Sequence, residues 1–206
     1  PHGCGYEQAE PLQAITRQLA LTLENIQLKE RLRRKSIENQ ALENIASLFA
    51  ANLPPGPLYR RFADEVKQLM HYDRITFYLS DEPGGNLSRV CQLGLGVCSS
   101  EPGPNQDLGG AAWESLVSSG TGLMIQDKPQ LGPSLWPDLG DNADLRSALI
   151  VSVRHSGEVA AVVALESQWP NVYGPAEMGL LSKAAEILTP WVAKLRLDNE
   201  LQGKAK

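Results

Sequence analysis

The residue types that most often carry catalysis are sparse in this sequence, where the histidines are His2, His71 and His155. We expect His71 at the end of a helix and His155 at a tight turn, where capping or solvent exposure is the usual role. No serine, cysteine or aspartate near them forms a nucleophile elbow or a triad pattern. The glycines of residues 94–96 and 120–122 lack the strand-to-helix setting of a phosphate-binding loop. We therefore expect no active site in this chain.

The cysteines Cys4, Cys91 and Cys98 are an odd number and contain no Cys-x-x-Cys spacing. This pattern argues against a zinc site and against a disulfide scaffold, and it is typical of a reducing compartment. We therefore expect no metal site and a cytoplasmic location.

Bulk composition excludes several other classes of protein. Hydrophobic residues make up 42% of the chain, which is typical of a globular protein, and the formal charge of -5 argues against nucleic-acid binding. We interpret the basic run at residues 29–35 as a solvated helix face. No stretch reaches the roughly 20 apolar residues of a membrane span. The chain starts with proline and carries no signal peptide, so we expect a fragment of a longer protein.

Long helices are predicted at both ends of the chain. Residues 7–51 contain good helix formers, with apolar residues at steps of three, four and seven and no glycine or proline after Leu12. A pattern this long favours a coiled coil or a bundle. The apolar stripe shifts near Ser36, and the sequence leaves open whether the helix continues through it. A final helix is predicted at residues 175–202, with Pro190 as a kink.

The two end helices share an apolar spacing at a constant offset. Sliding one onto the other pairs Leu12 with Leu181, Leu19 with Leu188, and Ile26 with Leu195. We infer that residues 1–35 are the closing helix of an upstream domain of the same kind, that 36–202 form one complete domain with its flanking helices, and that 203–206 are a tail. Both helices are expected to pair with a second copy, forming a homodimer through Leu19, Ile26, Leu188 and Leu195.

The residues between these helices predict an α+β domain. A proline-rich segment at residues 52–57 is predicted to end the first helix. After it, the sequence predicts a helix at 58–70 and a hairpin formed by strands at 74–80 and 87–95. It then predicts a helix at 109–119, a strand at 123–126, a long loop at 128–144, and a second hairpin formed by strands at 147–154 and 158–167. Hairpins imply an antiparallel sheet. We expect the end helices to cover one face of the sheet, and the middle helix and loops to cover the other.

The second half of the sequence resembles a GAF domain, a fold related to the PAS domain. The resemblance rests on an ordered set of segments: residues 109–110 opening a helix, then 119–127, 145–151 and 157–165, and Tyr173 where the family usually has phenylalanine. It extends over about residues 36–201. It implies an antiparallel sheet with helices on both faces, flanked by long signalling helices.

In the GAF family the middle helix and the loops enclose a ligand pocket. Carried onto this chain, the resemblance implies a lining of Phe77, Leu79, Trp113, Leu116, Met124, Trp136, Ser147, Leu149 and Val151. Each of these residues is also an ordinary core candidate. Asp127 and Arg146 are either a polar pair at the pocket mouth or surface residues at strand ends.

The resemblance implies a regulatory domain that senses a small ligand or relays a signal to an output domain, such as a histidine kinase or a cyclase, outside this chain. A ligand-free dimerisation spacer is the alternative. The family's bilin-binding Cys-His pair is absent, since Gln92 follows Cys91 and Ser99 follows Cys98, and its Asn-Lys-Phe-Asp-Glu signature for cyclic nucleotides is absent too. A haem or bilin sensor stays a minor alternative, and the cofactor is unknown.

Overall fold

The computed structural model of the 206-residue chain describes residues 9–50, 53–80, 87–95, 97–99, 105–106, 120, 122–127 and 144–204. The chain divides into two compact units, residues 1–40 and 41–206. The predicted helix at 109–119 and nearly all of the loop at 128–144 lie outside the described residues.

The first unit consists of helix in its described part. Helix α1 (Ala9–Ala50) runs without a break through Ser36, which answers the question left open by the sequence. It also continues past Gln40, where the first unit ends. The exposed fraction of its large apolar side chains lies between 46% and 70% at Ile15, Leu19, Leu21, Leu23, Ile26, Leu28, Leu32 and Ile37.

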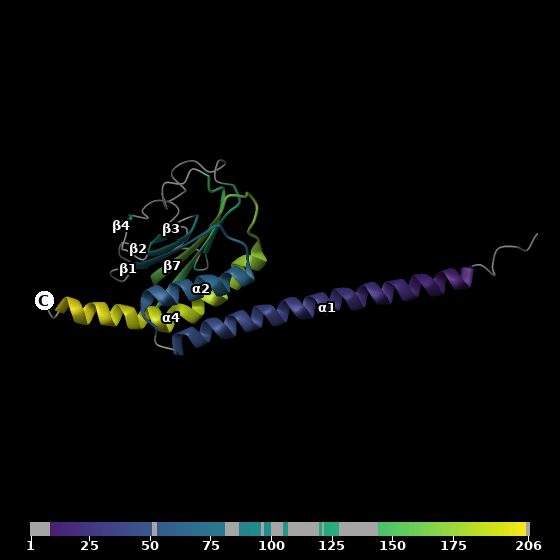
Figure 1. The fold of residues 1–206 in the computed structure, drawn as a ribbon, viewed down its shortest axis with the longest axis horizontal. Coiled ribbons are helices and arrows are strands. Elements are labelled where there is room, and N and C mark those ends of the chain that lie inside the picture. Colours follow the sequence, from purple (N-terminus) through teal and green to yellow (C-terminus); the bar gives the residue numbers. More distant parts are fainter. Residues whose placement is uncertain are drawn as a thin grey trace, which may run out of the picture. The chain divides into compact units, whose positions relative to one another are not determined.

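The second unit is the α+β domain that the sequence predicts. Its elements are α2 (Pro55–Leu69), β1 (Arg74–Ser80), β2 (Leu87–Gly94), β3 (Val97–Ser99), β4 (Asn105–Gln106), β5 (Gly122–Ile125), β6 (Ser147–His155), β7 (Glu158–Ser167) and α4 (Pro175–Lys204). The strands form an antiparallel sheet in the order β3-β2-β1-β7-β6-β5, with β4 also paired to β2 (Figure 1). Both predicted hairpins and the predicted strand β5 are confirmed.

Helix α2 begins inside the proline-rich segment that the sequence predicts to be a stop. Pro54 is its N-cap residue and Pro55 is its first helical residue. Proline is favoured at that position because its missing N–H has no partner in a helix and its φ is already helical. The amide of Leu58 donates to the Pro54 carbonyl at 3.2 Å and closes the first turn.

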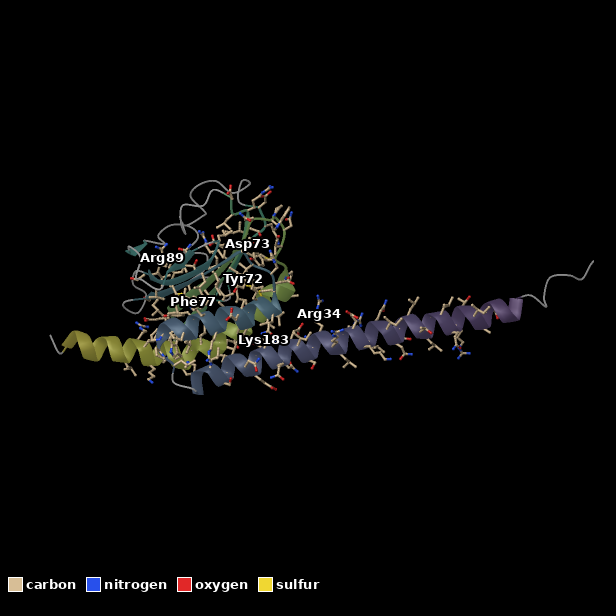
Figure 2. All side chains as sticks on the ribbon, in the orientation of Figure 1. Arg34, Tyr72, Asp73, Phe77, Arg89 and Lys183 are labelled. Carbon is tan, nitrogen blue, oxygen red and sulfur yellow. The ribbon has the colours of Figure 1, made fainter. Side chains whose placement is uncertain are left out.

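One face of the sheet packs against helices, and we call it the helix face. Figure 1 shows α2 and α4 together on one side of the sheet. Phe77 of β1 lies there (Figure 2), with its ring centroid 4.8 Å from that of Tyr59 and 5.5 Å from that of Phe62, both on α2. Leu181 of α4 and Ile45 of α1 are buried in the same cluster. This core holds α2, α4 and the part of α1 that belongs to the second unit to the sheet.

Gly94, at the end of β2, lies against the backbone of Asp73, the residue before β1, and a substitution there tests this contact. Its φ is +106°, and a Cβ there would lie 2.1 Å from the Asp73 carbonyl oxygen. Gly157 has a similar φ of +88° but no atom within 4 Å of the added Cβ. The positive φ alone costs alanine about 1–2 kcal/mol. We expect Gly94→Ala to lower the free energy of unfolding in urea by at least ~2 kcal/mol more than Gly157→Ala does. Equal losses would contradict the contact.

Candidate functional site

Five of the residues predicted to line a pocket lie on the helix face of the sheet. Phe77, Leu149 and Val151 are buried in the cluster formed with α2 and α4, and Leu79 and Met124 pack against that same cluster. These five side chains therefore belong to the helix face. Because side chains alternate along a strand, the opposite face is formed by their neighbours.

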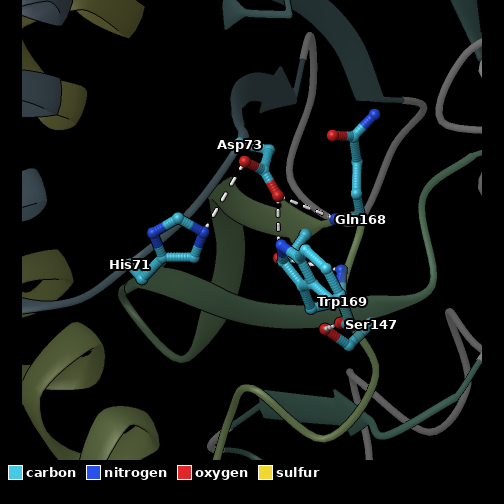
Figure 3. Close-up of polar contacts among 6 residues, drawn as sticks. His71, Asp73, Ser147, Gln168 and Trp169 are labelled. Atoms are coloured by element: carbon cyan, nitrogen blue, oxygen red, sulfur yellow. Dashed lines mark hydrogen bonds and ion pairs between the residues drawn. The ribbon is translucent and has the colours of Figure 1, made fainter.

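Ser147 has a structural role that its pocket assignment did not anticipate. Its buried hydroxyl donates to the Trp169 carbonyl oxygen at 2.6 Å and so fixes the segment after β7 (Figure 3). The other predicted lining residues lie outside the described residues, and they are Trp113, Leu116 and Trp136.

A histidine, an aspartate and a serine lie next to one another beside this segment (Figure 3). Which of them contacts which decides whether they have the arrangement of a catalytic triad. Asp73 accepts hydrogen bonds from the Ser167 hydroxyl and the Gln168 amide, both at 2.8 Å, and His71 Nε2 lies 3.6 Å from its other oxygen. In a catalytic triad the histidine lies between the nucleophile and the carboxylate. Here the carboxylate is in the middle and the histidine contacts only the carboxylate, so the three residues do not have the order of a catalytic triad. The network ties the start of β1 to the end of β7.

Two further sequence expectations concern charged and turn residues. Arg146 and Asp127 form a two-point ion pair with N–O distances of 2.8 and 3.1 Å. The Arg146 side chain is 45% exposed, as expected of residues at strand ends. His155 is exposed at the hairpin turn between β6 and β7, as predicted.

The opposite face of the sheet, which we call the second face, carries polar groups among small apolar ones. Its buried apolar residues are Tyr78, Leu87, Ile125, Ala148, Ile150, Val159, Val162 and Ala164. Four residues that lie opposite one another on adjacent strands form a row across this face. They are Arg89 of β2, Tyr78 of β1, Val162 of β7 and Ser152 of β6. In the next row Gln92 lies opposite Thr76. We call Thr76, Tyr78, Arg89, Gln92 and Ser152 the polar patch.

The polar patch has unused hydrogen-bonding capacity. Thr76 Oγ1, Tyr78 OH, Arg89 Nε and Ser152 Oγ are buried, and none makes a hydrogen bond of good geometry with a described residue. Burial raises the pKa of the Tyr78 hydroxyl and the nearby Glu166 carboxylate adds to the rise, while Arg74, Arg89 and the neighbouring Thr76 hydroxyl oppose it in part. Tyr78 therefore keeps its proton at neutral pH and remains a donor. Because buried polar groups are rarely left unpaired, four of them in one patch suggest a missing partner.

A buried ion pair borders the patch on the second face. Arg74 of β1 and Glu166 of β7 are directly opposite each other, and Arg74 holds the carboxylate through both Nε and Nη2, the latter at 2.8 Å from Oε1. Their side chains are 2% and 0% exposed. The pair is charge-neutral and already satisfied, so it supports the sheet and leaves the patch its own charge on Arg89.

A comparison of the chain with models of known protein families identifies its family. Residues 54–189, more than half of the chain, match the family model for the GAF domain. The chain belongs to the GAF family. The resemblance seen in the sequence is thereby confirmed, as is its fold.

Solved structures share the fold of this GAF domain at low sequence identity. The GAF domain of an Acinetobacter phosphoenolpyruvate-protein phosphotransferase has a TM-score of 0.61 and 16% identity, covering 75% of this chain and 92% of that one. The Neisseria meningitidis free methionine-R-sulfoxide reductase gives 0.59 and 18%, covering 81% and 91%. The GAF domain of a Bacillus halodurans two-component sensor histidine kinase gives 0.56 and 17%, covering 71% and 98%. No curated protein matches the chain.

The residues predicted to pair two copies of this GAF protein differ in their surroundings. Leu19 and Ile26 of α1 are 59% and 55% exposed. Leu188 of α4 is 2% exposed and packs into the domain's own core. It therefore cannot serve as a dimer contact, and the prediction is corrected there. Leu195 is partly buried, whereas Leu197, two residues further on, is largely exposed.

The described residues of this GAF domain contain neither a candidate metal site nor a candidate membrane span. Within them, no group of three His, Cys, Asp or Glu side chains could hold a metal ion. No helix in the same residues combines the length and the apolar character needed to cross a bilayer.

Proposed function

We propose that this GAF domain is a non-catalytic sensor of a cytoplasmic signalling protein. It binds a small molecule at the polar patch and passes the resulting change, through helices paired with a second copy, to an output domain such as a histidine kinase or a cyclase. The proposal depends mainly on one observation, the four buried donors of the second face that lack a described partner. The buried thiol of Cys91, which forms no disulfide with a described residue, supports a reducing compartment.

A continuous set of contacts supports transmission from the patch to the last helix. Tyr78 on the second face and Phe77 on the helix face are consecutive residues of β1. Phe77 contacts Tyr59 of α2, and the Tyr59 ring meets Trp191 of α4 edge-on with 5.2 Å between centroids. A ligand that shifts Tyr78 must move β1, and this stacked aromatic path carries the movement to α4.

The exposed apolar side chains of α1 support pairing with a second copy. Leu19 and Ile26 are seven residues apart, the repeat of a coiled-coil seam, and Ile15 precedes them at a step of four. A helix this apolar on its surface loses much favourable burial if it stays single in water. An identical helix supplies the same seam, so a second copy is the partner that we propose.

We expect the wild-type chain to sediment as a dimer and Leu19→Gln/Ile26→Gln to weaken the dimer at least a hundredfold. Each dimer would lose four buried side chains, each contributing about 1.5–3 kcal/mol. Leu21→Gln/Leu28→Gln is the matched control, since these leucines are also seven apart and exposed but about 200° around the helix from the seam. Analytical ultracentrifugation over a concentration series measures both. A monomeric wild type, or equal weakening by the two variants, would refute the pairing.

The sensor itself is tested by equilibrium dialysis of the purified chain against a metabolite extract, followed by mass spectrometry. Enrichment of a small molecule by the chain supports a sensor. No enrichment would overturn ligand sensing and leave the dimerisation spacer as the function. A visible absorption band in the purified protein would instead indicate haem or bilin. Neither His71 nor His155 belongs to the polar patch, and His71 is 59% exposed, which disfavours haem.

A further inference from the structure

We propose that the polar patch recognises an oxyanion, a carboxylate or phosphate group carried by a small molecule. This inference rests on the proposed function, because it names the chemical class of ligand for the same patch. Arg89, Tyr78 and Thr76 are the residues that would bind the group.

The charge on Arg89 is the first argument. Among the described residues its guanidinium has a neutral partner, Gln92, whose Oε1 accepts from Nη1 at 3.0 Å, and no carboxylate. Its Nε is buried and without a partner of good geometry in that part of the chain. A partly buried cation without a counter-charge is unfavourable, and a bound anion would supply both the charge and the hydrogen-bond acceptor.

The hydroxyls beside Arg89 are the second argument. Tyr78 lies directly opposite Arg89 on the neighbouring strand, and Thr76 is two residues away on the same face as Tyr78. Side chains so placed have Cβ atoms about 4.5–5.5 Å apart across the strands. Both hydroxyls can donate, and Tyr78 stays protonated because burial raises its pKa. Three donors therefore converge on one end of the patch, and an oxyanion is the acceptor that can use all of them.

The rest of the second face indicates which other chemical groups the ligand would carry. The Arg74–Glu166 pair is neutral as a unit, so the patch has a net positive charge that would repel a cation. The row from Arg89 to Ser152 crosses four strands, about 14 Å. Between its ends lie Val162 and, in the next row, Ala164, both buried and apolar. The face thus fits a small molecule with an anionic group near Arg89, a short apolar part, and a polar group near Ser152.

The test uses the full chain and three defined probes: glutarate, inorganic phosphate, and glutaramide as the uncharged counterpart of glutarate. We expect at least one anion to raise the thermal unfolding midpoint over a concentration series, and glutaramide to have no such effect. A response to glutarate alone identifies a carboxylate, and a response to phosphate alone identifies a phosphate. Failure of both anions to exceed glutaramide would overturn the proposal.

Variants assign the effect to the patch. Arg89→Gln is expected to weaken binding of the effective anion at least tenfold, and Tyr78→Phe by about ten- to a hundredfold, the value of one hydrogen bond to a charged group. Arg146→Gln removes an arginine elsewhere on the domain and is expected to change nothing. Arg89→Met also removes the charge and replaces Arg89→Gln if the latter does not fold. An anion response unchanged in the Arg89 variant would refute the site.

The dialysis experiment separates this inference from the function on which it rests. A neutral molecule enriched from the extract, together with no response to either anion, would refute oxyanion recognition and leave the sensor intact. An extract from which nothing is enriched would refute the sensor as well. Enrichment of an acidic molecule whose binding is lost in Arg89→Gln would support both.

Discussion

Arg74→Met is expected to lower the free energy of unfolding by about 3–5 kcal/mol, because it leaves the Glu166 carboxylate buried without its counter-charge. Glu166 is 0% exposed, so water cannot replace the guanidinium. Glu166→Leu is expected to cost a similar amount by leaving Arg74 alone. The double variant Arg74→Met/Glu166→Leu removes both charges and should recover most of the loss, since apolar residues of similar size often replace a buried pair at little cost. Urea unfolding followed by circular dichroism measures all three.

The exposed pair of Arg146 and Asp127 is the control for that cycle. It has the same two-point geometry, but its arginine is 45% exposed, so water can partly replace the guanidinium and Arg146→Met should cost clearly less than Arg74→Met, about 1 kcal/mol. Losses at Arg74 and Glu166 that simply add in the double variant would contradict a mutual interaction across β1 and β7.

The strands were predictable because local turn chemistry fixes them. The hairpin of β6 and β7 turns at Ser156 and Gly157, where φ is +54° and +88°. Two successive residues with positive φ produce the backbone twist that matches a two-residue hairpin, and glycine accepts that conformation without cost. The start of α2 was not found, because a proline-rich segment can equally end one helix and begin the next.

The face of each strand was harder to predict than the strand itself. In β1 every residue but Leu79 is buried, so the usual alternation of buried and exposed positions is missing. A weaker signal was present. Ile75, Phe77 and Leu79 are purely apolar, whereas Thr76 and Tyr78 between them each carry a hydroxyl. That alternation of polar atoms, rather than of hydrophobicity, marks the face of the candidate site.

Helical periodicity likewise could not say which partner an apolar stripe contacts. Leu188 and Leu19 occupy matching positions in their helices, yet Leu188 is in the core of its own domain and Leu19 is exposed. The spacing predicts that a stripe will be buried, and only the fold decides whether the same chain or a second copy buries it. Arg89 was missed for a related reason, because a single arginine on a strand resembles any surface residue until its neighbours are known.

Phe77→Ala is expected to lower the free energy of unfolding by about 3–5 kcal/mol, the usual cost of removing a buried aromatic ring and leaving a cavity. The ring lies between those of Tyr59 and Phe62 on the helix face, so few neighbouring atoms can move in to fill the space. Tyr78→Phe, one residue along β1, is expected to change that free energy by less than about 1 kcal/mol, because its hydroxyl has no described partner to lose. Urea unfolding of the two variants compares the two faces directly.

The comparison of Phe77→Ala with Tyr78→Phe distinguishes a side chain that stabilises the fold from one that contributes only to ligand binding. If Tyr78→Phe cost as much as Phe77→Ala, the Tyr78 hydroxyl would be part of the folded core, and its place in the polar patch would lose its meaning. If Tyr78→Phe left stability unchanged but weakened anion binding, the buried hydroxyl would have a role only in the complex. A stable sheet whose second face has buried donors without a described partner can bind a ligand without refolding. A ligand bound there acts on β1, the strand that also holds Phe77 against the helices.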